Sequence, residues 1–260
     1  IQTLGYVQAA FNGGFLDYHA LQTKVEKRFS RGFYFLNSFT WSKAIDNASG
    51  HLEANNGDNS RVNYLNLAGE KGLSGYDQPV NNTTTLLYDL PFGKGRKFGD
   101  SWARPADLIA GGWRLSVINF ATSGIPVNLT YGPSSTFQVS GAPNYRPNIS
   151  GDPVMPEGQR TVAQWLNPAT VSIPTDITQP FGNAGRNIVR APSYHAMNFG
   201  LHKDFRVMEG HKVEFRMEAF NFFNKTNLGA PNGNRSAGNF GSITGTQPAR
   251  EIQFALRYAF

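Results

Sequence analysis

The sequence predicts an all-β fold of antiparallel strands, and three observations lead to this prediction. The final segment, 250–260, alternates apolar and polar residues, as a strand does when its side chains point to opposite faces. The chain has 28 Gly and 13% aromatic residues but only 16% charged residues, which is typical of strands and turns rather than long helices. The connections between candidate strands alternate between short and long.

The C-terminal segment carries the clearest strand pattern. Its even positions are apolar or aromatic and its odd positions are polar or small: Ile252, Phe254, Leu256, Tyr258 and Phe260 against Glu251, Gln253, Ala255, Arg257 and Ala259. Soluble proteins rarely finish on such a strand, because chain ends fray and carry polar residues. A strand of a membrane barrel has an outward apolar side, an inward polar side and interfacial aromatic residues. The segment therefore indicates a barrel strand, with the edge strand of a soluble sheet as the alternative.

Composition and charge argue against other classes of protein. No apolar run approaches the ~20 residues that a membrane-spanning helix needs. The net charge is +6, but the basic residues alternate with acidic ones along the strands and form no block, so a mixed-charge surface explains it better than a nucleic-acid partner. The chain has no cysteine, which suits passage through an oxidising periplasm and is also common in cytosolic proteins.

The N-terminal part predicts a β-hairpin. Residues 1–16 read as the end of a loop, and 18–29 and 33–41 read as two strands joined by a tight turn at 30–32. The first strand has two distinct sides: Leu21, Thr23, Val25 and Phe29 against Gln22, Lys24, Glu26 and Arg28.

Five further strands follow from the same period-two pattern. We predict them at 80–90, 113–122, 194–205, 211–223 and 250–260, with 125–130 continuing the second of these after a bend at Gly124. The segments 42–79, 131–192 and 224–247 read as long loops, the second with one helical turn at 162–166. The segment 91–112 reads as an irregular connection with a short turn near 105–107.

The lengths of the connections predict the orientation of the sheet. Outer-membrane barrels have short turns on the periplasmic side and long loops outside. If Phe260 lies at the periplasmic end, the connections at 30–32, 91–112 and 206–210 all fall on that side, and the three long loops fall outside. The expected fold is therefore part of an antiparallel transmembrane β-barrel, with about seven or eight strands in this chain.

The two sides of the strands predict which residues meet lipid and which line the barrel. A charge facing lipid near the bilayer midplane costs ~2–4 kcal/mol, so charged sides must face the lumen. We expect the lumen-facing residues to be Gln22, Lys24, Glu26, Arg28, Lys212, Glu214, Arg216, Glu218 and Arg257. We expect the lipid-facing or interfacial residues to be Tyr18, Phe29, Tyr194, Phe205, Phe215, Phe254, Leu256 and Tyr258.

No pattern of catalytic, cofactor or metal-binding residues emerges from the sequence. The five histidines lack the spacing of a zinc site, and Ser38, Ser42 and His19 have no acid and base placed around them for hydrolysis. The loop 46–58, with Asp46, Asn47, Glu53, Asn55 and Asn56, has oxygen ligands suited to calcium but not the spacing of a known calcium loop. A solvated external loop is the simpler interpretation.

Several motifs together resemble the C-terminal part of a TonB-dependent receptor, specifically the Oar-like group with a carboxypeptidase-regulatory-like domain. They are, in order, YHALQTKVEKRFSRG at 18–32, FTWSKAID at 39–46, LPFGKG at 90–95, GGW at 111–113, GIP at 124–126, RMEAFNFFN at 216–224 and LRYAF at 256–260. The resemblance spans nearly the whole chain. It departs at 77–82, where such receptors often place a basic pair before the third strand.

The resemblance implies uptake of a large nutrient across the outer membrane, driven through TonB. It also implies a 22-stranded barrel with a plug domain, so residues 1–260 would be its C-terminal portion, without the plug and the TonB box. The barrel-assembly machinery would recognise the ending with Tyr258 and Phe260. The implied partners are outer-membrane lipid, this machinery, TonB through the N-terminal region that is absent here, and an unknown nutrient.

Two alternatives to TonB-dependent transport stay open at this point. One is a passive porin-like or adhesive barrel, and the other is a soluble β-sandwich that binds carbohydrate through exposed aromatic residues. The chain begins at Ile1 without a visible signal peptide, so we interpret it as processed, trimmed or part of something longer.

Overall fold

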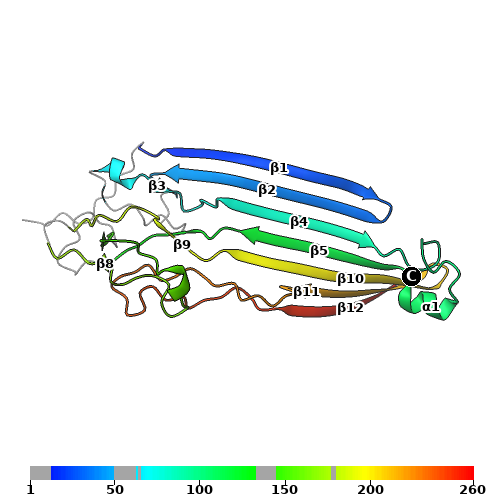
Figure 1. The fold of residues 1–260 in the computed structure, drawn as a ribbon. Helices are drawn as coiled ribbons and strands as arrows, with labels where there is room; N and C mark the ends of the chain where they lie inside the picture. The colour runs from blue at the N-terminus through cyan, green and yellow to red at the C-terminus, as the bar shows by residue number, and fades with distance from the viewer. Residues whose placement is uncertain (1–12, 50–62, 64–65, 133–144, 177–179) are drawn as a thin grey trace, which may run out of the picture.

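The computed structural model describes residues 13–49, 63, 66–132, 145–176 and 180–260. Its main feature is one antiparallel sheet (Figure 1), which confirms the predicted fold class. Seven long strands form this sheet, and we call them the wall: β1 (Leu16–Ser30), β2 (Phe33–Asp46), β4 (Val80–Asp89), β5 (Trp113–Thr122), β10 (Tyr194–Met208), β11 (His211–Phe220) and β12 (Glu251–Ala259). Their spatial order follows their order along the chain, and the short strand β3 (Gly72–Leu73) adds to β2.

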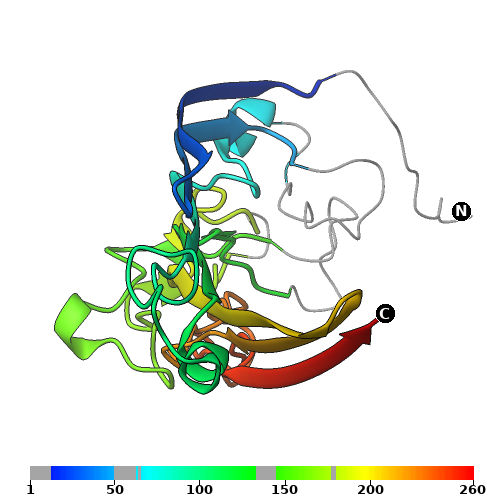
Figure 2. The same cartoon turned by 90° about the vertical axis from the view of Figure 1, so that its right-hand side faces the viewer.

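The wall is curved and open. Viewed along the strands, it forms an arc with β1 at one edge and β12 at the other (Figure 2). Within the described residues, each of these strands pairs with one long neighbour only, so both edges keep free backbone groups. The predicted number of strands is confirmed.

Short and long connections lie at opposite ends of the wall, as predicted (Figure 1). We call these the turn end and the outer end. The β1–β2 turn uses Arg31 and Gly32, with φ of 52° and 77°, because a two-residue hairpin needs left-handed backbone to match the twist of its strands. The β10–β11 turn uses Gly210 with φ 75°. The third connection at this end, between β4 and β5, contains helix α1 (Arg104–Ala110) where only an irregular turn was expected.

The ends of several strands differ from the predicted ones. Strand β2 continues to Asp46, because its last residues pair with both β1 and β3 and the Ala44 N–H donates to Asp77 Oδ1 at 2.6 Å. Strand β11 stops at Phe220, three residues early, because Asn221 adopts φ 48°. Strand β10 continues to Met208, past the expected end at Phe205.

Residues 125–130 do not extend the wall as predicted. Instead β6 (Pro126–Val127) pairs with β9 (Val189–Arg190) in a separate sheet of the outer loops. The prediction failed because Gly124 approaches the 191–192 backbone too closely for any other residue, and the chain leaves the wall there.

The outer loops are folded. They contain β7 (Asn148–Ile149) paired with β8 (Val171–Ser172) and two short 3-10 helices, η2 (Leu67–Glu70) and η3 (Glu157–Gln159). The helical turn predicted at 162–166 is wrong, because Leu166 forms a β-bridge with Val154. Leu129, Leu166, Val171 and Val189 are fully buried together, so a hydrophobic core lies in these loops. No helix in the described part of the chain has the length and apolar character to cross a bilayer.

Candidate functional site: the wall and its outer loops

The register of the wall sorts its side chains into two faces. Residues paired across neighbouring strands point to the same side, so each row of partners belongs to one face. Two neighbouring rows are almost wholly apolar: Phe35, Leu86, Val117, Phe199, Ala219 and Ile252, and Phe33, Tyr88, Leu115, Leu201, Met217 and Phe254. We call the side that carries them the apolar face and the other side the polar face.

Most of the apolar face lacks a protein partner in the described part of the chain. Phe254 and Leu256 are 70% and 74% exposed, and no second sheet packs over them among the described residues. A soluble β-sandwich buries this side of its strands against another sheet. The geometry therefore contradicts the β-sandwich alternative. The predicted lipid-facing residues that belong to this face are Phe205, Phe215, Phe254, Leu256 and Tyr258.

One polar cluster interrupts the apolar face near the outer half of β2 and β4. The Asn37 amide donates to Asn82 Oδ1 and to Thr84 Oγ1, both at 2.8 Å. These side chains satisfy one another, which lowers the cost of holding them on an apolar surface.

The polar face brings together the charged residues predicted on β11 and β12. Lys212 Nζ lies 2.6 Å from Glu214, Arg257 lies 3.9 Å from the same carboxylate, and the Gln253 amide donates to Glu218 at 2.5 Å. Arg216 lies in the row that also holds Asp89, Arg114 and His202. Asp89 accepts from Arg114 Nε at 2.6 Å, so these two opposite charges on neighbouring strands are paired.

The charged residues predicted on β1 lie at the other edge of the polar face. Gln22, Lys24 and Glu26 share the polar face, but β1 is the opposite edge of the sheet from β12. Lys24 pairs with Glu26 on its own strand, 2.9 Å apart. The two predicted charged groups are thus separate stretches of one face.

Three expected interfacial aromatics need correction. Tyr18 and Tyr194 lie opposite Ala44 and Thr122, and therefore on the polar face. Gln22 is predicted to face the lumen and lies on the same face, so the two predictions cannot both hold. Charged residues share this face and favour the lumen, so the lipid-facing prediction for the two tyrosines is the one that fails. A bulge after Lys27 places both Arg28 and Phe29 opposite one residue of β2, so alternation no longer assigns them to opposite faces.

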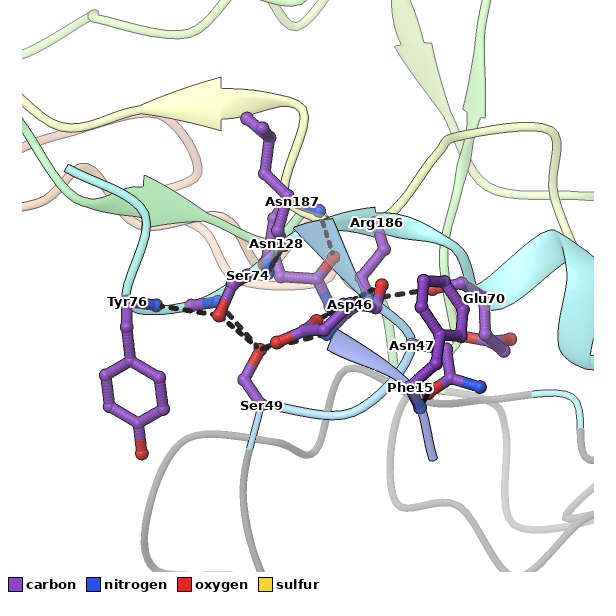
Figure 3. Close-up of polar contacts among 12 residues, drawn as sticks. Phe15, Asp46, Asn47, Ser49, Glu70, Ser74, Tyr76, Asn128, Arg186 and Asn187 are labelled. Atoms are coloured by element: carbon purple, nitrogen blue, oxygen red, sulfur yellow. Dashed lines mark hydrogen bonds and ion pairs between the residues drawn. The ribbon is translucent and has the colours of Figure 1, made fainter. Parts of the chain in front are cut away.

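Buried ion pairs fix the outer loops to the end of β2. Arg186 is fully buried and forms a salt bridge with Asp46, the last residue of β2 (Figure 3). Its guanidinium also donates to the Glu70 carbonyl at 2.9 Å and to Ser49 Oγ at 3.1 Å. Burial lowers the pKa of Arg186 to about 10, which still leaves it charged at neutral pH.

Two more arginines extend this cluster. Arg146 makes a bidentate pair with Glu70, with N–O distances of 2.7 and 2.9 Å, and both side chains are buried. Arg190 pairs with Asp77, whose other oxygen accepts from the Ala44 N–H at 2.6 Å. The sequence analysis missed these arginines, because their partners are 76 to 140 residues away and no local pattern connects them.

The calcium hypothesis for the loop 46–58 loses support where the structure can address it. The Asp46 carboxylate is engaged by Arg186 and Ser49, and Asn47 Oδ1 accepts from the Phe15 N–H at 2.9 Å. Glu53, Asn55 and Asn56 lie outside the described residues. Among the described residues, no group of acidic and histidine side chains has the arrangement of a metal site.

A cleft of about 430 Å³ opens between the outer loops. Asp152, Arg160, Trp165 and Arg190 line it together with the chain at 191–193. The Arg160 guanidinium lies 5.7 Å from the Trp165 ring, and Arg190 is held at its other side by Asp77. The cleft is therefore lined by two cationic side chains, one acidic side chain and one aromatic ring.

Arginine at Leu256 is expected to prevent stable insertion of the barrel, because a charge on the apolar face near the midplane costs ~2–4 kcal/mol. The matched change Ala255→Arg puts the same charge on the polar face of the same strand and should be tolerated. Each substitution is made in the protein expressed from its own gene. The measurement is the amount of folded barrel in outer-membrane fractions, detected as protein whose gel mobility changes on heating. Equal loss in both variants would argue against two chemically distinct faces.

Replacement of Arg186 by Met is expected to loosen the outer loops, because one partner of a buried ion pair is left without the other, at a cost of about 3–5 kcal/mol. Hydrogen exchange of residues 66–74 and 180–190 should speed up accordingly. Arg160→Met serves as the control, since Arg160 is exposed. Unchanged exchange in the Arg186 variant would mean that the cluster does not hold the loops.

The comparisons with known proteins agree with this geometry. A family described as the outer membrane β-barrel domain matches residues 1–253, which include most of the wall. No curated protein is detectably similar in sequence. The chain belongs to the outer membrane β-barrel domain family and is located in the bacterial outer membrane.

Proposed function

We propose that this chain is the C-terminal barrel portion of a TonB-dependent transporter that imports a large nutrient. The observation that carries the proposal is the open, gently curved wall, whose edges β1 and β12 both lack a second long partner within the described residues. Free strand edges are unfavourable in lipid, because no water satisfies their backbone groups. The wall therefore needs additional strands, as a larger barrel would provide.

The motifs along the chain support a specific kind of larger barrel. The segments at 18–32, 90–95 and 216–224 resemble TonB-dependent receptors of the Oar-like, carboxypeptidase-regulatory-like group. These segments lie in β1, directly after β4, and in β11 with the turn that follows it. In such a receptor the polar face would line the lumen and contact a plug domain encoded before Ile1.

The outer cleft and the buried cluster beneath it suit a receptor. The ion pairs of Arg146, Arg186 and Arg190 hold the loops in one arrangement. Preorganised loops bind ligands at a lower entropic cost than loose ones. We infer that these loops contribute to nutrient capture and that the chain does no chemistry on the nutrient.

The free edge of the wall at β12 supports the proposed route of assembly. Phe260 is 90% exposed, follows β12 and lies 5.8 Å from the Tyr258 ring. Aromatic side chains on a free edge strand are accessible to another strand-binding protein. The barrel-assembly machinery is the partner that we propose for it, and TonB would act only through the region before Ile1.

The protein expressed from its own gene and reconstituted in liposomes should not pass small sugars, because a plug would fill the lumen. Osmotic swelling in arabinose measures this, with a general porin as the positive control. The purified periplasmic domain of TonB should bind the same preparation. Rapid swelling without TonB binding would contradict the proposal and favour a passive porin-like barrel.

A further inference from the structure

The β4–β5 connection at the turn end has a surface that the proposed transport function does not use. It comprises residues 90–112, including helix α1, and we call it the turn-end anchor. Two contacts hold α1 to the apolar face. Trp113 Nε1 donates to the Ile109 carbonyl at 2.8 Å, and Lys203 Nζ donates to the carbonyls of Asp107, at 3.3 Å, and Gly111.

These contacts place α1 on the outside of the arc. Trp113 and Lys203 are register partners on the apolar face. Figure 2 shows α1 on the convex side of the curved wall. The helix therefore continues the apolar face at the end of the wall where the membrane surface would lie.

Apolar side chains of the turn-end anchor point outward. Ile109 is 75% exposed, and Leu108, Phe92 and Phe98 are exposed as well. The rings of Phe92 and Phe98 lie 5.8 Å apart, and Trp102 stacks on Phe92 at 6.5 Å. A cluster of aromatic and aliphatic side chains beside a lipid-facing surface is typical of a segment that lies in the membrane interface.

The charges of the same connection favour an anionic surface. Lys94, Lys97 and Arg104 are exposed, and no salt bridge involves them within the described residues. The two acidic residues of this connection are each engaged by the backbone instead: Asp107 Oδ1 accepts from the Lys94 N–H and Asp100 Oδ1 from the Gly95 N–H, both at 2.7 Å. With Arg96, which pairs with Asp89, the connection carries four basic residues against two acidic ones, so its net charge is positive.

We propose that the turn-end anchor binds anionic phospholipid headgroups of the periplasmic leaflet. Its apolar side chains would enter the acyl boundary, and Lys94, Lys97 and Arg104 would contact phosphate groups, as basic residues of interfacial segments do. A soluble protein partner is less favoured, because the anchor is continuous with the apolar face. The proposal depends on the outer-membrane location and not on TonB coupling.

The first test measures which lipid stays bound. The protein expressed from its own gene is purified in detergent with equal amounts of phosphatidylglycerol and phosphatidylcholine, and bound lipid is quantified by mass spectrometry. We expect enrichment of phosphatidylglycerol, and a return to the ratio of the mixture in the triple variant Lys94→Gln, Lys97→Gln and Arg104→Gln. Arg31→Gln is the control, since Arg31 is exposed at the same end. Enrichment that persists in the triple variant would overturn the proposal.

The second test asks whether the anchor lies in lipid or in water. Ile109→Cys should react with a charged maleimide much more slowly in phosphatidylglycerol vesicles than Glu209→Cys, which lies in the β10–β11 turn at the same end. Labelling of both cysteines at equal rates would place Ile109 in water. That outcome would overturn the lipid proposal and leave the surface open to a protein partner or a second copy of the chain.

Discussion

The structure depends on one constraint, namely that most of an apolar sheet face about seven strands wide has no protein cover in the described part of the chain. Apolar surface costs roughly 25 cal/mol per Å² when water covers it. A face on which Phe254, Leu256 and Trp41 are mostly exposed is therefore stable only against another apolar phase. The bilayer supplies that phase, and the backbone bonds of the wall satisfy the polar groups that lipid cannot.

This constraint explains why the core of the protein lies outside its sheet. Leu129, Leu166, Val171 and Val189 are fully buried, and all belong to the outer loops. Those loops lie in water and must bury apolar side chains among themselves, with buried pairs such as Arg186 and Asp46 fixing them to the wall. The wall thus exposes its apolar side chains and the loops bury theirs, because in each part apolar side chains avoid water.

Sequence alone predicted the wall well, because a strand that separates two environments repeats its pattern every second residue. Val213 to Met217 and Ile252 to Tyr258 follow that rule, and their pairing in the structure matches it. It predicted the loops poorly. Asp46 and Arg186 are 140 residues apart, and their contact depends on how the loops fold over the strand ends. Tyr18 and Tyr194 are expected to face lipid or the interface, whereas the register puts them on the polar face.

The most direct test of lipid contact places one fluorophore on each face of the same strand. Residues 1–260 contain no cysteine, so a single cysteine can be introduced here by Phe254→Cys or by Gln253→Cys. Each variant is made in the protein expressed from its own gene, labelled with the fluorophore and reconstituted in lipid vesicles. We predict that nitroxide on lipid chains quenches the label at 254, and that aqueous iodide quenches the label at 253. Quenching at 254 by iodide but not by lipid nitroxide would contradict the assignment of the apolar face to the bilayer.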